Sequence, residues 1–93
     1  MIKVNEYFDG NVKSMALENE DGKATVGVMV AGEFEFGTST VEYMTVVSGS
    51  MTVLLPGETA WKTYSPFQTF VVPANARFKL KLDKPAAYRC LYK

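Results

Sequence analysis

The sequence predicts an all-β protein, a sandwich or barrel built from short strands. Apolar and polar residues alternate with a period of two along most of the chain, as they do when one face of each strand is buried. Glycine, proline, asparagine and aspartate recur as turn signals roughly every eight to twelve residues. No segment carries apolar residues at helical spacing over the length of an ordinary helix.

Length and composition predict one domain over residues 1–93. The chain has 93 residues, of which 47% are hydrophobic and 22% charged, and it includes six Phe, five Tyr and one Trp. These aromatic side chains can bury a large apolar area, which excludes a disordered chain. One core is expected because the chain is too short for two.

Charge and cysteine content restrict the partners and the compartment. Ten Lys and Arg residues balance ten Asp and Glu residues, so no net field attracts the chain to nucleic acid or to an anionic membrane. The single cysteine, Cys90, cannot form an internal disulfide, and the N-terminal residues lack the apolar run of a signal peptide. We therefore expect a cytoplasmic protein with no nucleic-acid or membrane partner.

Histidine is absent from the sequence. It is the commonest metal ligand and a frequent general base. A Ser-His triad and a zinc site with histidine ligands are therefore excluded.

The first two expected strands are Lys23–Val30 and Glu33–Thr38. Phenylalanines alternate with glutamates in the second, so one of its faces is apolar. Asp21-Gly22 precedes the first strand and Ala31-Gly32 separates the two. Both dipeptides are turn signals, and the second predicts a hairpin that joins these strands.

Four further strands are expected in the middle of the chain, and turn residues end most of them. The first two flank the turn Ser48-Gly49-Ser50, and the last ends at Pro73-Ala74-Asn75. These strands are Val41–Val47, Met51–Leu55, Trp61–Tyr64 and Thr69–Val72.

Two strands are expected near the end of the chain. Phe78–Leu82 alternates apolar residues with lysines, and Tyr88–Tyr92 places its tyrosines and Cys90 on one face. The N-terminal segment Met1–Met15 could supply an extra strand that pairs with the sheet edge of another subunit, which would hide that edge.

Glu42 and Gly49, with six residues between them, resemble the second half of the first cupin motif, and residues 73–78 resemble the second motif. The resemblance implies the cupin fold, a double-stranded β-helix with a jelly-roll-like barrel. The positions that hold metal ligands in metal-binding cupins are here Phe36, Thr38, Glu42 and Phe78. One carboxylate, one hydroxyl and two phenyl rings do not supply the three or four donors that a transition metal needs. We therefore predict a metal-free site without a cofactor.

Seven blocks of residues in order span nearly the whole chain, among them Asn5-Glu6-Tyr7-Phe8-Asp9-Gly10, Glu42-x-Met44-Thr45-Val46-x-Ser48-Gly49 and Tyr88-x-Cys90-x-Tyr92. Together they resemble the pyrimidine/purine nucleoside phosphorylase family of small cupins. The resemblance implies a single cupin domain that forms a homodimer. It also implies phosphorolysis of purine and pyrimidine nucleosides to free base and α-D-ribose 1-phosphate, with broad base specificity.

Glu42 is the candidate catalytic residue. It is the only acidic residue within a strand that has apolar neighbours on its own face, and a carboxylate can accept two charge-assisted hydrogen bonds from vicinal ribose hydroxyls. The alternative is an exposed surface carboxylate. The candidate substrate-binding residues are Glu42 itself, Phe36, Thr38, Met44, Phe78, Tyr88 and Cys90.

These neighbours have alternative interpretations as packing residues. Phe36 and Phe78 could stack on a flat base, and the thioether of Met44 could adapt to several substrates, but all three could equally be core. Tyr88 is a candidate proton donor to the leaving base. Cys90 is expected to be a small buried hydrophobe rather than a nucleophile.

The candidate phosphate ligands are Thr38, Arg77 and Lys13. Lys13 could reach the barrel of a partner if the N-terminal segment crosses between subunits, although charged residues on a small barrel are usually solvated. Two other functions remain open. The first is a cupin that binds a sugar or nucleoside without catalysis, and the second is a dimeric scaffold with a plain hydrophobic barrel.

Overall fold

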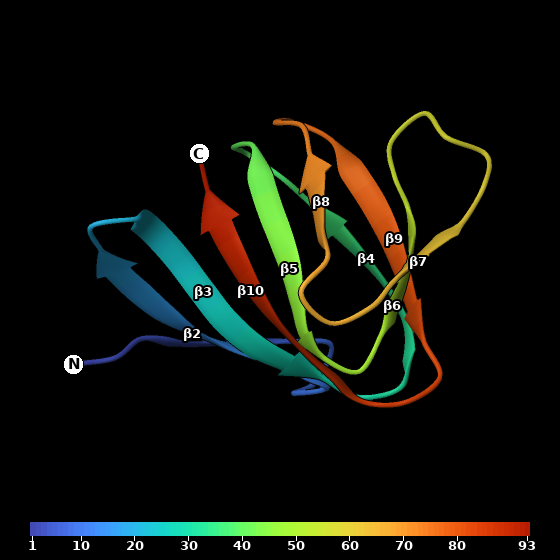
Figure 1. The fold of residues 1–93 in the computed structure, drawn as a ribbon. Helices are drawn as coiled ribbons and strands as arrows, with labels where there is room; N and C mark the ends of the chain where they lie inside the picture. Colours follow the sequence, from blue (N-terminus) through green and yellow to red (C-terminus); the bar gives the residue numbers. More distant parts are fainter.

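Ten strands form two antiparallel sheets in a computed structural model that describes residues 1–93. One sheet has the order β1-β2-β3-β10-β5-β8 and the other β4-β9-β6-β7, and the two pack face to face (Figure 1). The all-β prediction is confirmed. The structure holds no helix long and apolar enough to cross a membrane. The strands are β1 (Val4–Tyr7), β2 (Val12–Asn19), β3 (Gly22–Met29), β4 (Gly32–Gly37), β5 (Glu42–Ser48), β6 (Met51–Leu54), β7 (Lys62–Tyr64), β8 (Thr69–Val72), β9 (Arg77–Leu82) and β10 (Ala86–Tyr92).

The eight expected strands are all present, and their ends lie within two residues of the expected ends. The alternation that predicts them is also the alternation of burial. Along β9, for example, Phe78, Leu80 and Leu82 are buried and the basic residues between them are exposed. Period-two burial is what two stacked sheets impose on their strands.

The predicted hairpin at Ala31-Gly32 is wrong. β3 and β4 lie in different sheets, because β2 and β10 already occupy both edges of β3. Ala31-Gly32 instead carries the chain from one sheet to the other. The hairpin that involves β3 is formed with β2, where Asn19 lies opposite Gly22.

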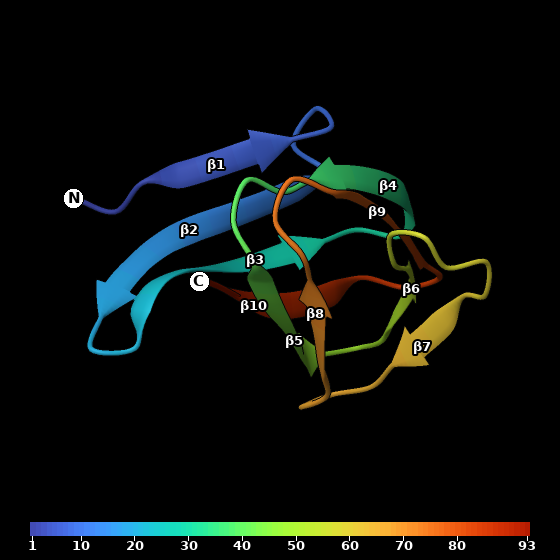
Figure 2. The same cartoon turned by 90° about the horizontal axis from the view of Figure 1, so that it is seen from above.

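The N-terminal segment Met1–Met15 contains β1 and the first half of β2. The expectation of an extra strand there is confirmed, and β1 pairs with β2 of the same chain. Because β1 is the edge strand of its sheet, its pairing with another subunit stays a prediction. Figure 2 shows β1 lying along β2 at the side of the molecule. Tyr7 on β1 and Ser14 on β2 consequently line a pocket inside the barrel of the same chain.

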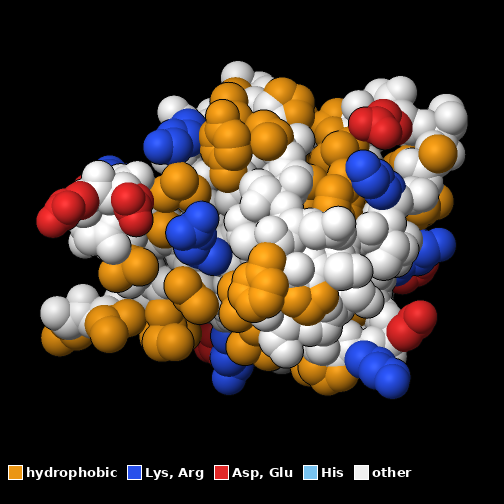
Figure 3. All heavy atoms as spheres, viewed as in Figure 1, with side chains coloured by type: hydrophobic (Ala, Val, Ile, Leu, Met, Phe, Trp, Pro, Cys, Tyr) orange, Lys and Arg blue, Asp and Glu red, His pale blue; other side chains and the backbone are white.

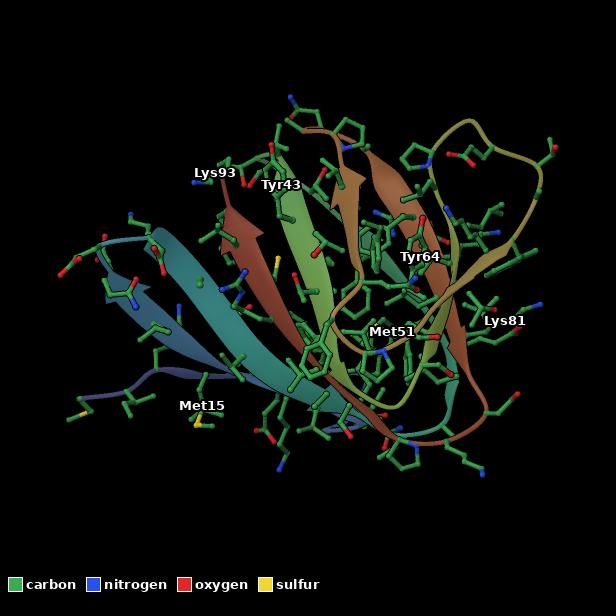
Figure 4. All side chains as sticks on the ribbon, in the orientation of Figure 1. Met15, Tyr43, Met51, Tyr64, Lys81 and Lys93 are labelled. Atoms are coloured by element: carbon green, nitrogen blue, oxygen red, sulfur yellow. The ribbon has the colours of Figure 1, made fainter.

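The core fills the space between the sheets, where sixteen buried residues form one cluster. Met51 on β6 and Tyr64 on β7 are register partners and both point into it, whereas Lys81 on β9 points away (Figure 4). Gly49 allows the chain to turn from β5 into β6. It has a φ of 81°, and a Cβ atom there would lie 2.9 Å from the carbonyl oxygen of Pro85. Several of these core residues, among them Met44 and Phe78, also line the pocket described next.

Candidate functional site

A pocket of about 120 Å³ opens between the two sheets. It is called the Glu42 pocket below. Six of the seven predicted substrate-binding residues line it, and Thr38 does not. The lining residues are Tyr7, Ser14, Met29, Phe36, Gly37, Glu42, Met44, Phe78, Tyr88, Cys90 and Tyr92.

Glu42 is the first residue of β5 and lies opposite Tyr92 of β10. Its side chain is half-buried, so it is not a fully solvated surface carboxylate. Oε1 accepts a hydrogen bond of 3.4 Å from the thiol of Cys90, and Glu42 forms no ion pair. Burial raises the pKa of Glu42, and the hydrogen bond from Cys90 opposes that shift.

The inward face of β10 carries Tyr88, Cys90 and Tyr92, which line the same pocket as Glu42. Burial raises the pKa of Tyr88 to about 12 and also raises the pKa values of Cys90 and Tyr92. These three groups are therefore neutral at physiological pH. No lysine, arginine or second acid lines the pocket, so Glu42 is its only acidic side chain.

The opposite wall is aromatic. The rings of Phe36 and Phe78 stack with their centroids 6.0 Å apart at 29°, and Tyr7 meets the edge of Phe36 at 6.0 Å and 82°. Phe36 and Phe78 are register partners on β4 and β9, whereas Tyr7 comes from β1. The pocket thus has an apolar, ring-lined side and a side with hydroxyl, thiol and carboxyl groups.

Gly27 makes room for Tyr88. A Cβ atom at Gly27 would lie 2.7 Å from Cζ and Oη of Tyr88 and 2.7 Å from the backbone oxygen of Lys13. The ring of Tyr88 therefore rests on the backbone of β3, and no larger residue at position 27 fits without moving it.

The three predicted phosphate ligands lie outside the Glu42 pocket. The hydroxyl of Thr38 donates to the carbonyl oxygen of Pro73 at 2.6 Å and accepts from the amide of Ala76 at 3.0 Å, so it ties two loops together. Arg77 pairs with Glu35 at 2.6 Å, and the hydrogen bond that it donates lowers the pKa of that carboxyl. Lys13 pairs with Glu6 at 3.2 Å, and both side chains are exposed.

Sequence reasoning did not select five of the lining residues. Tyr92 shares the alternation that selected Tyr88 and Cys90, so the sequence held a signal for it. The others are harder, because Tyr7 and Ser14 belong to strands that the alternation did not resolve, and Met29 and Gly37 carry no distinctive chemistry.

No three His, Cys, Asp or Glu side chains lie close enough together to hold a metal ion. At the positions equivalent to cupin ligands, two residues are phenylalanines and the hydroxyl of Thr38 is engaged with backbone groups. Glu42 is left as a single strong donor, with the thiol of Cys90 beside it. This donor set does not fit a transition metal, which needs three or four ligands.

Known proteins of one family are similar to this chain over its whole length. A family described as "Pyrimidine/purine nucleoside phosphorylase" matches residues 2–92. Proteins with that name from Pseudomonas aeruginosa and Cellvibrio japonicus are 55% and 58% identical to it, over 100% and 99% of both chains.

Solved structures agree on the fold. A protein of unknown function from Vibrio parahaemolyticus superposes with a TM-score of 0.93 at 43% identity, covering 97% of this chain and 96% of that one. An RmlC-like cupin from Shewanella frigidimarina superposes with a TM-score of 0.74 at 17% identity, covering 96% and 80%. The predicted cupin barrel is confirmed.

Proposed function

Because the chain belongs to the pyrimidine/purine nucleoside phosphorylase family, we propose that it splits purine and pyrimidine nucleosides with inorganic phosphate. The products are the free base and α-D-ribose 1-phosphate. The observation that carries the proposal is the isolation of Glu42, the one acidic side chain in a pocket otherwise lined by rings, thioethers and neutral hydroxyls.

Glu42 holds the ribose. The vicinal 2′- and 3′-hydroxyls are two donors at the spacing of a carboxylate, and hydrogen bonds to a charged acceptor are stronger than neutral ones. The half-buried position of Glu42 reduces competition from water, which strengthens those bonds further. As the glycosidic bond breaks, the sugar gains positive charge, and a fixed carboxylate stabilises that charge.

The aromatic wall holds the base. Phe36 and Phe78 offer ring faces and edges but no hydrogen-bond donors or acceptors, so they contact any flat heterocycle without reading its edges. Met44 and Met29 add flexible thioethers that adapt to rings of different size. Broad base specificity follows from this chemistry.

The hydroxyls of Tyr88 and Tyr92 are the available donors to the leaving base. Both are neutral at physiological pH because burial raises their pKa values, so each retains the proton that a departing nitrogen or a base carbonyl would accept. The hydroxyls of Tyr92 and Thr25 share a hydrogen bond of 2.9 Å, which orients Tyr92. The proposed reaction uses these groups and no metal ion.

The assay is release of free base from purified protein with uridine or adenosine, with and without phosphate. The proposal expects base release from both nucleosides that depends on phosphate, and accumulation of ribose 1-phosphate. Binding of nucleoside without release, in a folded protein, would instead support a non-catalytic nucleoside-binding cupin.

A homodimer is also part of the proposal. One row of residues crosses five strands of the six-stranded sheet on its outer face and contains no charged or strongly polar side chain. The row consists of Leu17, Ala24, Leu91, Tyr43 and Val71. Figure 3 shows hydrophobic side chains spread over this face between a few basic ones. An apolar surface of this extent favours association with a second copy.

A further inference from the structure

A second hollow adjoins the Glu42 pocket, and Tyr92 lines both. It has a volume of about 540 Å³ and is open to solvent. It is called the lysine pocket here, because Lys3 and Lys23 lie in its wall together with the hydroxyls of Thr25, Ser39 and Thr40. Its one acidic side chain is Glu18.

The ammonium groups of the two lysines are free to bind an anion. Neither Lys3 nor Lys23 forms an ion pair, although Glu18 lies opposite Lys23 in the register of β2 and β3. The sequence-based candidates Lys13 and Arg77, by contrast, each pair with a glutamate. The lysine pocket therefore offers two ammonium groups, several hydroxyl donors and a net positive charge to a ligand from solution.

The strand register aligns Lys23 with the residues of the Glu42 pocket. Leu91 lies opposite Ala24, so the next position of the same antiparallel register sets Tyr92 beside Lys23, and Tyr92 lies opposite Glu42 on its other side. Lys23, Tyr92 and Glu42 thus form one row on the inner face of three adjacent strands. Neighbouring strands are spaced by about 4.8 Å, so the Cα atoms of Lys23 and Glu42 are roughly 10 Å apart.

Lys3 approaches from the same side. The amide of Ala16 donates to the carbonyl oxygen of Lys3 at 2.9 Å, which extends the β1–β2 ladder by one residue. Ala16 lies opposite Thr25, whose hydroxyl bonds Tyr92. Lys3 and Lys23 therefore project over the same patch of the sheet from neighbouring rows.

We propose that inorganic phosphate, the second substrate, binds in the lysine pocket to Lys23 and Lys3, across Tyr92 from Glu42. The inference rests on the proposed function. A phosphate dianion is repelled by the carboxylate of Glu42, so it needs cationic donors outside the Glu42 pocket. Lys23 and Lys3 supply such donors. The ribose of the bound nucleoside lies between the two opposite charges, beside the neutral ring of Tyr92, which lines both pockets.

This arrangement gives each group one task in the displacement. Glu42 holds the ribose hydroxyls, and the lysines hold the phosphate with one oxygen toward C1′. That oxygen forms the new bond to C1′ as the C1′–N bond breaks, and the electron pair of the broken bond leaves with the base, which then takes up a proton. Positioning two substrates in line supplies a large part of the rate.

The test is the variant Lys23→Gln, with the two Michaelis constants measured separately. The expected result is an increase of about tenfold or more in the KM for phosphate, since a charge-assisted contact is lost, with the KM for nucleoside nearly unchanged. Lys23→Arg keeps the charge and should retain most of the phosphate affinity. Lys84→Gln, at an exposed turn outside both pockets, is the matched control.

Lys13→Gln and Arg77→Gln test the competing sites. The proposal is overturned if either of them raises the phosphate KM more than Lys23→Gln does, or if Lys23→Gln leaves it unchanged. Calorimetric titration of inorganic phosphate into wild type and Lys23→Gln tests binding without turnover. Phosphate binding that is lost in the variant supports the lysine pocket even if the wild type splits no nucleoside, and equal binding in both proteins contradicts it.

Discussion

The thiol of Cys90 donates a hydrogen bond to Oε1 of Glu42 from the adjacent strand, at 3.4 Å. A thiol is a weak donor, so the bond lowers the pKa of Glu42 less than burial raises it. Cys90 is itself held as the neutral thiol, because burial and the charge of Glu42 both raise its pKa. Of the two groups, Cys90 is therefore the hydrogen-bond donor and Glu42 the acceptor.

Cys90→Ala should move the acid limb of the pH profile to higher pH. The substitution removes the donor that stabilises the Glu42 carboxylate, so the pKa of Glu42 rises further and the ionised form appears later as pH increases. Activity on the alkaline side should remain, because Cys90 is not a nucleophile. The measurement is kcat/KM against pH.

Cys90→Ser is the control for that experiment, since it restores a hydroxyl donor and should leave the acid limb near that of the wild type. Complete loss of activity at every pH in a folded Cys90→Ala protein would contradict this assignment and point to covalent chemistry at Cys90.

Glu42→Gln should increase stability at neutral pH. The folded-state pKa of Glu42 lies above its unfolded value, so the folded protein binds this proton more tightly and loses stability as pH rises through that interval. Glutamine removes the penalty of burying the charge. The difference in Tm between variant and wild type should be positive at neutral pH and shrink as pH falls below the unfolded pKa. A Glu42→Gln protein that is less stable than wild type at neutral pH contradicts the burial argument.

Gly27→Ala should lower stability and impair nucleoside binding together. The added methyl group would lie 2.7 Å from Tyr88 and from a backbone oxygen, and the backbone cannot yield as a flexible side chain can. Overpacking of this kind costs about 1–3 kcal/mol. Urea denaturation measures the loss, and the nucleoside KM should rise because Tyr88 is displaced into the pocket. Unchanged values of both would show that the contact is looser than described.

Val71→Lys should dissociate the proposed homodimer. Val71 is exposed at 45% and ends the apolar row on the outer face of the six-stranded sheet, so a lysine there places a charge in the interface without disturbing the core. Sedimentation velocity should show a dimer for wild type and a monomer for the variant. Thr63→Lys, an exposed position on the other sheet, should remain dimeric. A monomeric wild type, or a dimeric Val71→Lys protein, contradicts the proposed interface.

The strands were predictable because two stacked sheets impose the same alternation on every strand that they bury. The pairing of the strands was harder to predict. Ala31-Gly32 has the composition of a hairpin turn, and only the pairing of β3 with β2 and β10 shows that the chain must cross to the other sheet there. Turn chemistry is local, whereas sheet membership depends on strands far along the chain.

The same distinction applies to the site. Glu42 and Cys90 were selected individually from their strands, but only the antiparallel register of β5 and β10 brings them into contact. Tyr7 depends on a β1–β2 pairing that the N-terminal alternation did not specify. Lys23 was assigned no role, because its alignment with Tyr92 and Glu42 runs across three strands that are distant in sequence.

The most direct test of the account is phosphorolysis by Glu42→Gln beside wild type, with uridine and adenosine and with folding checked by circular dichroism. Two hydrogen bonds to a charged acceptor are weakened and the stabilising charge is lost, so kcat/KM should fall by roughly a hundredfold or more for both nucleosides. A folded Glu42→Gln protein that retains wild-type kcat/KM would show that this carboxylate does not hold the ribose.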